Sequence, residues 1–90
     1  MTVAYKIIVK GRVQGVWFRK YTKDKADSLN LSGFARNELD GSVYIEVEGE
    51  EDHITQFIGW LDMGSPLSKV NSVDVEHIAI QAYQSFEIRR

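Results

Sequence analysis

The chain lacks cysteine altogether and has one proline among its 90 residues. Without cysteine, a disulfide framework, a thiolate metal site and a phosphocysteine intermediate are all excluded. No apolar run is long enough to cross a bilayer, and residues 1–10 alternate apolar and polar side chains instead of forming the apolar centre of a signal peptide. We therefore expect a soluble, cytoplasmic protein that binds no membrane.

A strong excess of either charge is also missing. Eleven basic and thirteen acidic side chains give a formal net charge of −2, so there is no overall field to attract nucleic acid. A chain of 90 residues with 43% hydrophobic residues can close one core and rarely divides into two. The sequence predicts a single domain over residues 1–90, in which any bound anion is held by local groups.

Hydrophobic periodicity gives the order of the elements. Apolar residues at helical spacing predict two amphipathic helices, at residues 19–30 and from the acidic run at 50–52 to Gly64. Period-two alternation and short apolar runs predict five strands. We expect these strands at residues 3–10, 33–37, 43–48 and 72–78, and around 86–88.

Three details of these strands are specific enough to test. Asp40 and Gly41 tolerate positive φ, and this pair predicts a two-residue primed turn between the second and third strands. The third strand is expected to keep one face in water, with Tyr44, Glu46 and Glu48 on it. In the fourth strand, Val73 and Val75 are expected to point inward.

The order βαββαβ plus a short C-terminal strand is typical of an α+β fold, the ferredoxin-like plait. Two helices then cover one face of an antiparallel sheet. Right-handed crossovers make strands 1 and 2 run in the same direction, with strand 3 between them. The loop from Gly11 to Phe18 and the end of the second strand at Asn37 are therefore predicted to lie at the same edge of the sheet.

That loop joins a strand to a helix, where successive backbone N–H groups can converge on an anion. A Gly-bounded loop can equally be a simple tight turn. The glycine, lysine and hydroxyl pattern of a nucleotide-binding P-loop is missing, and so is the third glycine of a dinucleotide site. We predict that loop amides bind a phosphate, and the residues concerned are Val13, Gln14, Gly15, Val16, Trp17 and Phe18.

Arg19 and Asn37 are the two candidate catalytic residues. A cation in the first turn of a helix is unfavourable beside the helix dipole unless an anion lies nearby, although a solvated surface arginine is the common alternative. Asparagine near a hairpin often bonds its own backbone in an Asx turn, but Asn37 is expected at the same sheet edge as Arg19.

These two side chains suit an activated substrate. Without a nucleophile or a metal cluster beside them, a guanidinium and a carboxamide are poorly equipped to cleave a stable phosphate monoester. In an acyl phosphate the leaving group is a carboxylate, which departs without protonation. We predict that Arg19 binds the phosphoryl group and Asn37 orients the attacking water.

The remaining polar candidates have simpler explanations. His53 and His77 have no second ligand at metal spacing, and we interpret both as surface or boundary residues, so no metal site is predicted. Glu38 and Asp40 flank the predicted hairpin and are explained by solvation of the turn.

Two stretches, residues 11–19 (GRVQGVWFR) and 33–43 (GFARNELDGSV), resemble the two signatures of the acylphosphatases, and the turn at 64–66 fits as well. The resemblance spans nearly the whole chain. It implies a small monomeric plait without cofactor, with Arg19 matching the phosphate-binding arginine and Asn37 the water-positioning asparagine. It also implies small-molecule substrates such as carbamoyl phosphate, 1,3-bisphosphoglycerate and acetyl phosphate, with inorganic phosphate as a product.

Two positions depart from the family pattern. Asn30 stands where a glycine usually follows the first helix, and Ala35 where a larger apolar residue is common. Neither is one of the two predicted site residues, and asparagine tolerates the left-handed conformation in which a helix can end.

Other functions occur on the same plait topology. A nucleic-acid-binding plait needs exposed aromatics on the third strand, where this chain has Glu46 and Glu48. The alternative that stays open is a non-catalytic, regulatory acylphosphatase-like domain that binds carbamoyl phosphate, of the kind that begins hydrogenase-maturation carbamoyltransferases. Because the chain ends at Arg90, we expect the free enzyme.

Overall fold

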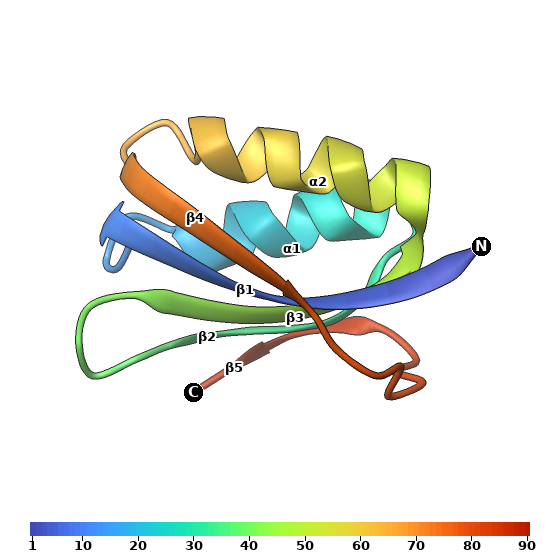
Figure 1. Ribbon diagram of the computed structural model, residues 1–90. Coiled ribbons are helices and arrows are strands. Elements are labelled where there is room, and N and C mark those ends of the chain that lie inside the picture. Colours follow the sequence, from blue (N-terminus) through green and yellow to red (C-terminus); the bar gives the residue numbers. More distant parts are fainter.

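The computed structural model describes residues 1–90 and has two helices packed on one face of a five-stranded sheet (Figure 1). Neither helix has the length and apolar character that a membrane crossing requires. In chain order the elements are β1 (Thr2–Arg12), α1 (Phe18–Ser28), β2 (Ser32–Asn37), β3 (Val43–Glu50), α2 (Glu51–Met63), β4 (Lys69–His77) and β5 (Phe86–Arg89).

The strand order β4-β1-β3-β2-β5 confirms the predicted plait. β3 pairs antiparallel with both β1 and β2, so β1 and β2 run in the same direction. Their C-terminal ends therefore lie on either side of β3, at the edge of the sheet where the strands end. β5 adds one feature that the sequence did not indicate, because it pairs with β2 in parallel and makes the sheet mixed. The chain reaches this position by crossing from β4, at one edge of the sheet, to the opposite edge.

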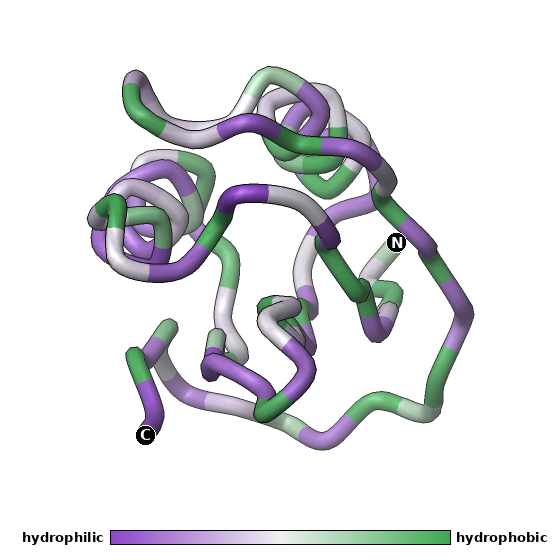
Figure 2. The backbone as a smooth tube through the Cα atoms, turned by 90° about the vertical axis from the view of Figure 1, so that its left-hand side faces the viewer, coloured by the Kyte–Doolittle hydropathy of each residue, from purple (hydrophilic) through white to green (hydrophobic).

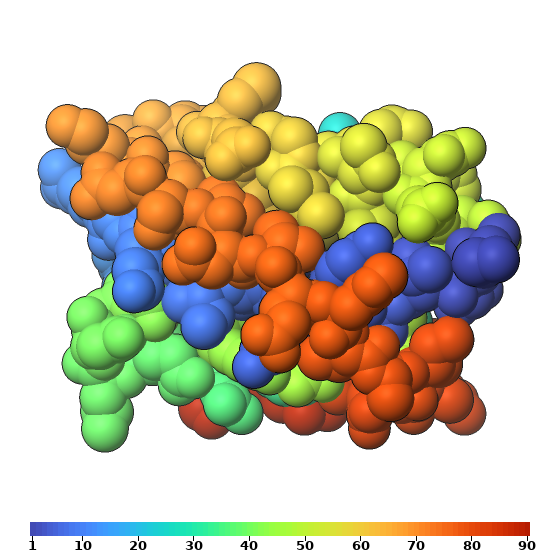
Figure 3. All heavy atoms as spheres, viewed as in Figure 1, coloured from blue at the N-terminus to red at the C-terminus, as the bar shows by residue number.

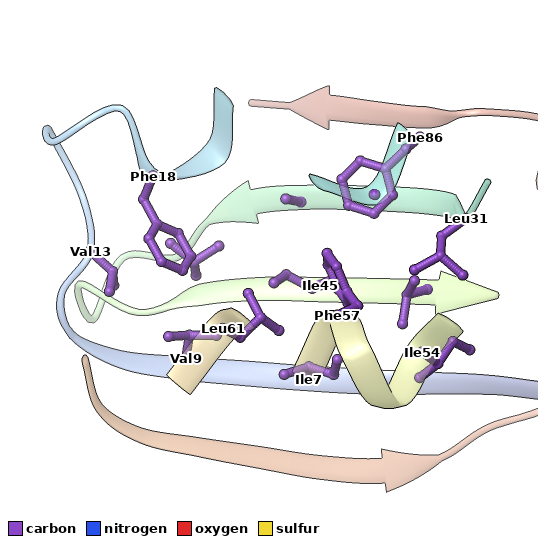
Figure 4. Packing of buried hydrophobic residues seen from close by; sticks show 14 of the residues in the cluster. Ile7, Val9, Val13, Phe18, Leu31, Ile45, Ile54, Phe57, Leu61 and Phe86 are labelled. Atoms are coloured by element: carbon purple, nitrogen blue, oxygen red, sulfur yellow. The ribbon is translucent and has the colours of Figure 1, made fainter. Parts of the chain in front are cut away.

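The hydrophobic core lies between the sheet and the helices (Figure 4). α2 contributes Ile54, Phe57 and Leu61, as its helical spacing predicts, while α1 contributes Thr22 and Ala26. These side chains pack on strand residues that include Ile7, Val9, Ile45 and Val47. The core also reaches the sheet edge, because Phe57 of α2 meets Phe86 of β5 edge-to-face with ring centroids 6.1 Å apart.

Helix ends follow from local chemistry. Carboxylates favour the positive end of a helix dipole, and α2 begins with Glu51 and Asp52 in its first turn. It ends before Gly64, as predicted. α1 ends two residues before the predicted limit, and Asn30 takes the left-handed conformation with φ 57°, which supplies the turn toward β2.

The connection between β2 and β3 differs from the prediction. It is a loop of residues 38–42, not a two-residue primed turn, and Asp40 does not have positive φ. The Gly41 N–H donates to the Glu38 carbonyl at 3.2 Å, and Gly41 alone takes positive φ at 93°. A turn followed by a glycine of positive φ closes longer hairpin loops, and the dipeptide pattern does not distinguish it from the tighter turn.

β4 begins at Lys69, earlier than predicted, because its first residues pair with the end of β1 beyond a register shift between Lys10 and Gly11. The prediction for Val73 is confirmed, since it packs on the core. Val75 pairs with the buried Ile7 and therefore lies on the same face of the sheet, as predicted, but it is not covered. Val75 is 41% exposed, because β4 is an edge strand and leaves the cover of the helices toward its end.

The face of β3 that was expected in water is partly covered. After β4 the chain passes around the side of the sheet opposite the helices (Figure 2) and covers part of the molecule's front surface (Figure 3). Glu48 is consequently buried, and its carboxylate accepts hydrogen bonds from the N–H groups of Gln81, Ala82 and Tyr83. The strand pattern could not reveal this cover, because it comes from a distant segment without regular structure.

Glu48 is thus the main polar attachment of the segment that leads to β5. We predict that Glu48→Ala lowers the free energy of unfolding by about 2 to 3 kcal/mol, because three backbone donors lose a charged acceptor. Urea unfolding followed by circular dichroism measures the change. Glu76→Ala on exposed β4 is the control and should change the free energy by less than about 0.5 kcal/mol. Equal effects of the two substitutions would contradict this role of Glu48.

Candidate active site

A cleft of about 440 Å³ opens at the sheet edge where β1 and β2 end. The loop between β1 and α1 forms one side of this site cleft, the first turn of α1 and the end of β2 form others, and β5 closes the last. The sequence predicted that the loop and Asn37 would share an edge, and the structure confirms it. The lining residues are Val13, Gly15, Trp17, Phe18, Arg19, Lys20, Asn37 and Ile88.

The β1–α1 loop, residues 13–17, keeps its backbone donors free. None of the N–H groups from Val13 to Trp17 donates a hydrogen bond to another protein group. Gly15 and Trp17 both have positive φ, 73° and 62°, and residues of this conformation can turn successive N–H groups toward one point. For tryptophan this conformation is strained, at a cost of about 1 kcal/mol or more, and such strain concentrates at functional sites.

Phe18 holds the strained loop in place. Its side chain is buried beside Val13, so both ends of the loop are anchored in the core (Figure 4). Trp60 of α2 stacks on Phe18 with ring centroids 5.9 Å apart. Trp17, in contrast, is 70% exposed and lies at the mouth of the cleft.

Gln14 and Val16 support the loop instead of lining the cleft. The Gln14 side-chain amide donates to the carbonyl oxygens of Glu38 and Ser42, each at 2.8 Å, and so ties the loop to the β2–β3 connection. Val16 is buried, and its carbonyl accepts a hydrogen bond from the Ser65 hydroxyl at 3.4 Å. The loop therefore has fixed neighbours on both sides.

Arg19 lies in the first turn of α1 and forms no ion pair, and that turn contains no acidic residue. One guanidinium N–H donates to the Arg89 carbonyl at 2.8 Å. This hydrogen bond uses one of five donors and leaves the positive charge without a carboxylate partner. Arg19 therefore brings a positive charge to the positive end of a helix dipole, an arrangement that a bound anion stabilises.

Arg89 is itself fixed from the other face of the sheet. Its guanidinium carbon lies 4.1 Å from the centroid of the Phe34 ring and 5.8 Å from that of Tyr83. Tyr83 donates its hydroxyl to Glu46 at 2.6 Å, and burial, with the nearby Glu46 carboxylate, raises the pKa of Tyr83 to about 12. The carbonyl that orients Arg19 therefore belongs to a strand held at both faces.

Asn37 ends β2 opposite Val43 of β3 and lines the same cleft as Arg19. Its Oδ1 atom is buried and accepts no hydrogen bond from the protein. The alternative of an Asx turn at Asn37 is not found, since Asp40 makes that interaction, accepting from the Ser42 hydroxyl at 2.6 Å and the Ser42 N–H at 2.9 Å. These two hydrogen bonds hold the pKa of the Asp40 carboxyl below its ordinary value.

The other polar candidates lie outside the cleft. Glu38 accepts a hydrogen bond from Arg36 at 3.3 Å. His53 lies in the first turn of α2, and His77 stacks on Tyr5 with ring centroids 4.3 Å apart. No group of three or more potential metal-ligating side chains occurs in the structure. The interpretation of these residues as turn and boundary residues agrees with their positions.

Sequence reasoning missed two lining residues, Lys20 and Ile88. Lys20 could have been found, because it is a second cation in the helix turn that singled out Arg19. Ile88 could not, because it reaches the cleft only through the parallel pairing of β5 with β2. The roles of Arg19 and Asn37 remain predictions from chemistry.

Fold and cleft together define a small plait protein with a cationic pocket beside a loop of free backbone N–H groups. A profile of the acylphosphatase family matches residues 5–88. The acylphosphatase of Bacillus licheniformis is 46% identical over 85 residues, which cover 93% of this chain and 94% of that protein.

Solved structures agree with these sequence matches. The crystal structure of acylphosphatase from Bacillus subtilis superposes with a TM-score of 0.95 at 38% identity and full coverage of both chains. Full-length HypF, in a phosphate- and nucleotide-bound form, matches with a TM-score of 0.90 at 32% identity, over 100% of this chain and 12% of that one.

The chain therefore belongs to the acylphosphatase family. It is an enzyme that hydrolyses acyl phosphates, and its substrates are small molecules. The resemblance of its two motifs is thereby confirmed.

Gln14 joins the β1–α1 loop to the connection between β2 and β3. A substitution at Gln14 therefore tests whether this contact holds the loop amides in place. We predict that Gln14→Glu raises the dissociation constant of inorganic phosphate about tenfold, because a carboxylate cannot donate to the two carbonyls and misplaces the loop amides. Isothermal titration calorimetry measures it. Gln56→Glu on the exposed side of α2 makes the same charge change and is the control. Equal phosphate affinities of the Gln14→Glu and Gln56→Glu proteins would contradict the predicted role of Gln14.

Proposed function

We propose that the protein hydrolyses acyl phosphates by direct attack of water on a phosphoryl group held by Arg19 and the β1–α1 loop, with Asn37 orienting the water. One observation carries this proposal: an unpaired arginine, a row of free backbone N–H groups and an asparagine with an unsatisfied acceptor share one cleft. Arg19 lacks a carboxylate partner, and the loop N–H groups and the Asn37 Oδ1 atom lack any hydrogen-bond partner in the protein. An acyl phosphate with its attacking water would provide these partners.

The phosphoryl oxygens bind to the loop amides and to the guanidinium of Arg19. The loop runs into the N-terminus of α1, so the helix dipole adds to the attraction. Hydrogen bonds from a guanidinium to phosphate are charge-assisted and about twice as strong as neutral ones. The Arg89 carbonyl supports this role, because it occupies one N–H of Arg19 at 2.8 Å and limits the directions of the others.

Asn37 holds the attacking water. Its carboxamide has one accepting and one donating end, and its last side-chain torsion is broad, so either end can turn toward the cleft. The water oxygen forms a bond to phosphorus while the bond from phosphorus to the acyl oxygen breaks in line. The electron pair of the broken bond leaves with the carboxylate, and the water proton passes to the phosphate.

This reaction requires no general acid. The carboxylate leaves as a stable anion, so positioning and charge neutralisation are the contributions that remain for the protein. Asp40 and Glu38, the carboxylates nearest to Asn37 in the chain, are engaged with Ser42 and Arg36. Neither carboxylate transfers a proton in the proposed reaction, and no step of it uses a metal ion or cofactor.

We further propose that the protein works in the cytoplasm as a monomer and binds neither nucleic acid nor membrane. The net charge of −2 supports the lack of nucleic-acid binding. The site cleft is compatible with a monomer, because Arg19, Asn37 and the β1–α1 loop already line one cleft without a second subunit.

The similarity to HypF keeps one alternative for the cellular role, in which the chain binds carbamoyl phosphate as a sensor and turnover is incidental. A sensor needs affinity, whereas an enzyme needs rate acceleration. The two roles differ in what loss of Asn37 does, since the water-positioning residue is required only for turnover.

Asn37 provides the first test. We predict that Asn37→Ala lowers kcat for benzoyl phosphate about 100-fold, because the attacking water loses its orientation, while phosphate affinity changes less than about threefold. Ultraviolet absorbance of benzoyl phosphate, with EDTA present, follows the reaction. Asn71→Ala on exposed β4 is the matched control. Unchanged kcat in Asn37→Ala would refute the role of Asn37, and slow turnover by the folded wild type would favour the sensor.

Arg19 provides the second test of the proposed function. We predict that Arg19→Ala weakens inorganic phosphate binding about 30-fold and lowers kcat as well, because the charge-assisted bonds act in both the ground state and the transition state. Calorimetric titration with phosphate gives the affinity. Arg12→Ala removes an equal charge at the exposed end of β1 and should cost far less. Similar phosphate affinity in Arg19→Ala and wild type would refute the assigned contact.

A further inference from the structure

A second hollow lies against the site cleft along the outside of α1. It measures about 430 Å³ and is lined by Trp17, Lys20, Tyr21 and Asp24. We call it the outer hollow. Trp17 and Lys20 line the site cleft as well, so these two side chains form the rim between the two spaces. A ligand whose phosphoryl group lies in the site cleft can therefore extend over this rim into the outer hollow.

The aromatic residues of the outer hollow are not part of the core. Trp17 is 70% exposed and Tyr21 is 43% exposed, and they stand one helical turn apart. Phe18, which lies between them in the sequence, packs in the hydrophobic core, but neither of these two rings does. Exposed aromatic rings at the mouth of a pocket provide flat apolar surface on which an organic group can pack.

Lys20 places a positive charge on the rim. Its ammonium group pairs with Asp24 at 3.1 Å, and both side chains are 58% exposed. An exposed ion pair of this kind contributes little to stability, so Lys20 can exchange Asp24 for another anion at small cost. Lys20 therefore provides a cation on the rim that Asp24 holds only weakly.

The positive charge at the start of α1 also favours binding of a second anion. Arg19 and Lys20 both lie in the first turn of α1, where no acidic residue balances them. Arg19 and the loop amides suffice to hold one phosphoryl group, which leaves Lys20 without a part in the proposed reaction. A second anionic group on the substrate would stabilise this second cation.

We propose that the outer hollow binds the acyl half of the substrate and that Lys20 selects acyl groups that carry a second anionic group, a carboxylate or a phosphate. This inference rests on the proposed function and adds the substrate class to it. Trp17 and Tyr21 pack against the carbon chain, while the Lys20 ammonium pairs with the distal anion. Lys20 is here a specificity-determining residue and takes no part in breaking the bond.

The test compares two substrates of the same shape. The first, 4-carboxybenzoyl phosphate, carries a distal negative charge, and the second, 4-carbamoylbenzoyl phosphate, is its neutral counterpart. The readout is the ratio of kcat/KM for the charged substrate to that for the neutral one, at low ionic strength. Because it is a ratio, it cancels any general loss of activity.

Lys20→Gln should lower this ratio about threefold to fivefold, mainly through KM, which is the size expected for one exposed ion pair. Added salt should lower the wild-type ratio toward that of the variant. Asp24→Asn should raise the ratio, because it removes the carboxylate that competes for Lys20. Lys23→Gln is the matched control, since Lys23 forms the equivalent pair with Asp27 at 2.7 Å and does not line the hollow.

Equal ratios in wild type and Lys20→Gln, or an equal fall in Lys23→Gln, would overturn the inference and leave the proposed function intact. Failure of the folded wild type to hydrolyse either substrate would instead overturn the proposed function, and this inference with it.

Discussion

The site depends above all on the pairing of β3 between β1 and β2. Because β3 runs antiparallel to both, the ends of β1 and β2 meet at one edge of the sheet, although they are separated by a helix in the sequence. The β1–α1 loop and Asn37 come together only through this pairing. Buried side chains on all three strands, including Ile7, Ile45 and Ala35, make a shift of register costly, since a shift by one residue would turn them toward the opposite face.

A series of contacts connects this strand pairing to Arg19. Glu48 of β3 binds the N–H groups of residues 81–83, which leads the chain to the edge where β5 pairs with β2. The Arg89 guanidinium packs on Phe34, and the Arg89 carbonyl accepts the hydrogen bond from Arg19. The face of the sheet away from the helices thus helps to orient a guanidinium that faces the cleft on the other side.

Much of the fold could be predicted because its signals are local. The helical spacing of Ile54, Phe57 and Leu61 describes one buried stripe, and strand alternation in β1 and β3 describes one buried face, so neither requires knowledge of distant partners. Features that depend on distant segments were missed or wrong. Val75 is exposed because β4 is an edge strand, and Glu48 is buried because residues 81–83 cover it.

The amino-acid sequence by itself determined the residue types of the site and their edge of the sheet. Glycine and polar residues between a strand and a helix, a cation in the first helical turn and an asparagine at a strand end are local features, and the order of elements with right-handed crossovers supplies their common edge. Only the tertiary structure decided the rest: the loop geometry with Trp17 at positive φ, the Arg89 carbonyl behind Arg19, and Ile88 as a wall. These features arise from packing and pairing between segments far apart in the chain, and no local pattern of residues encodes the distance between two such segments.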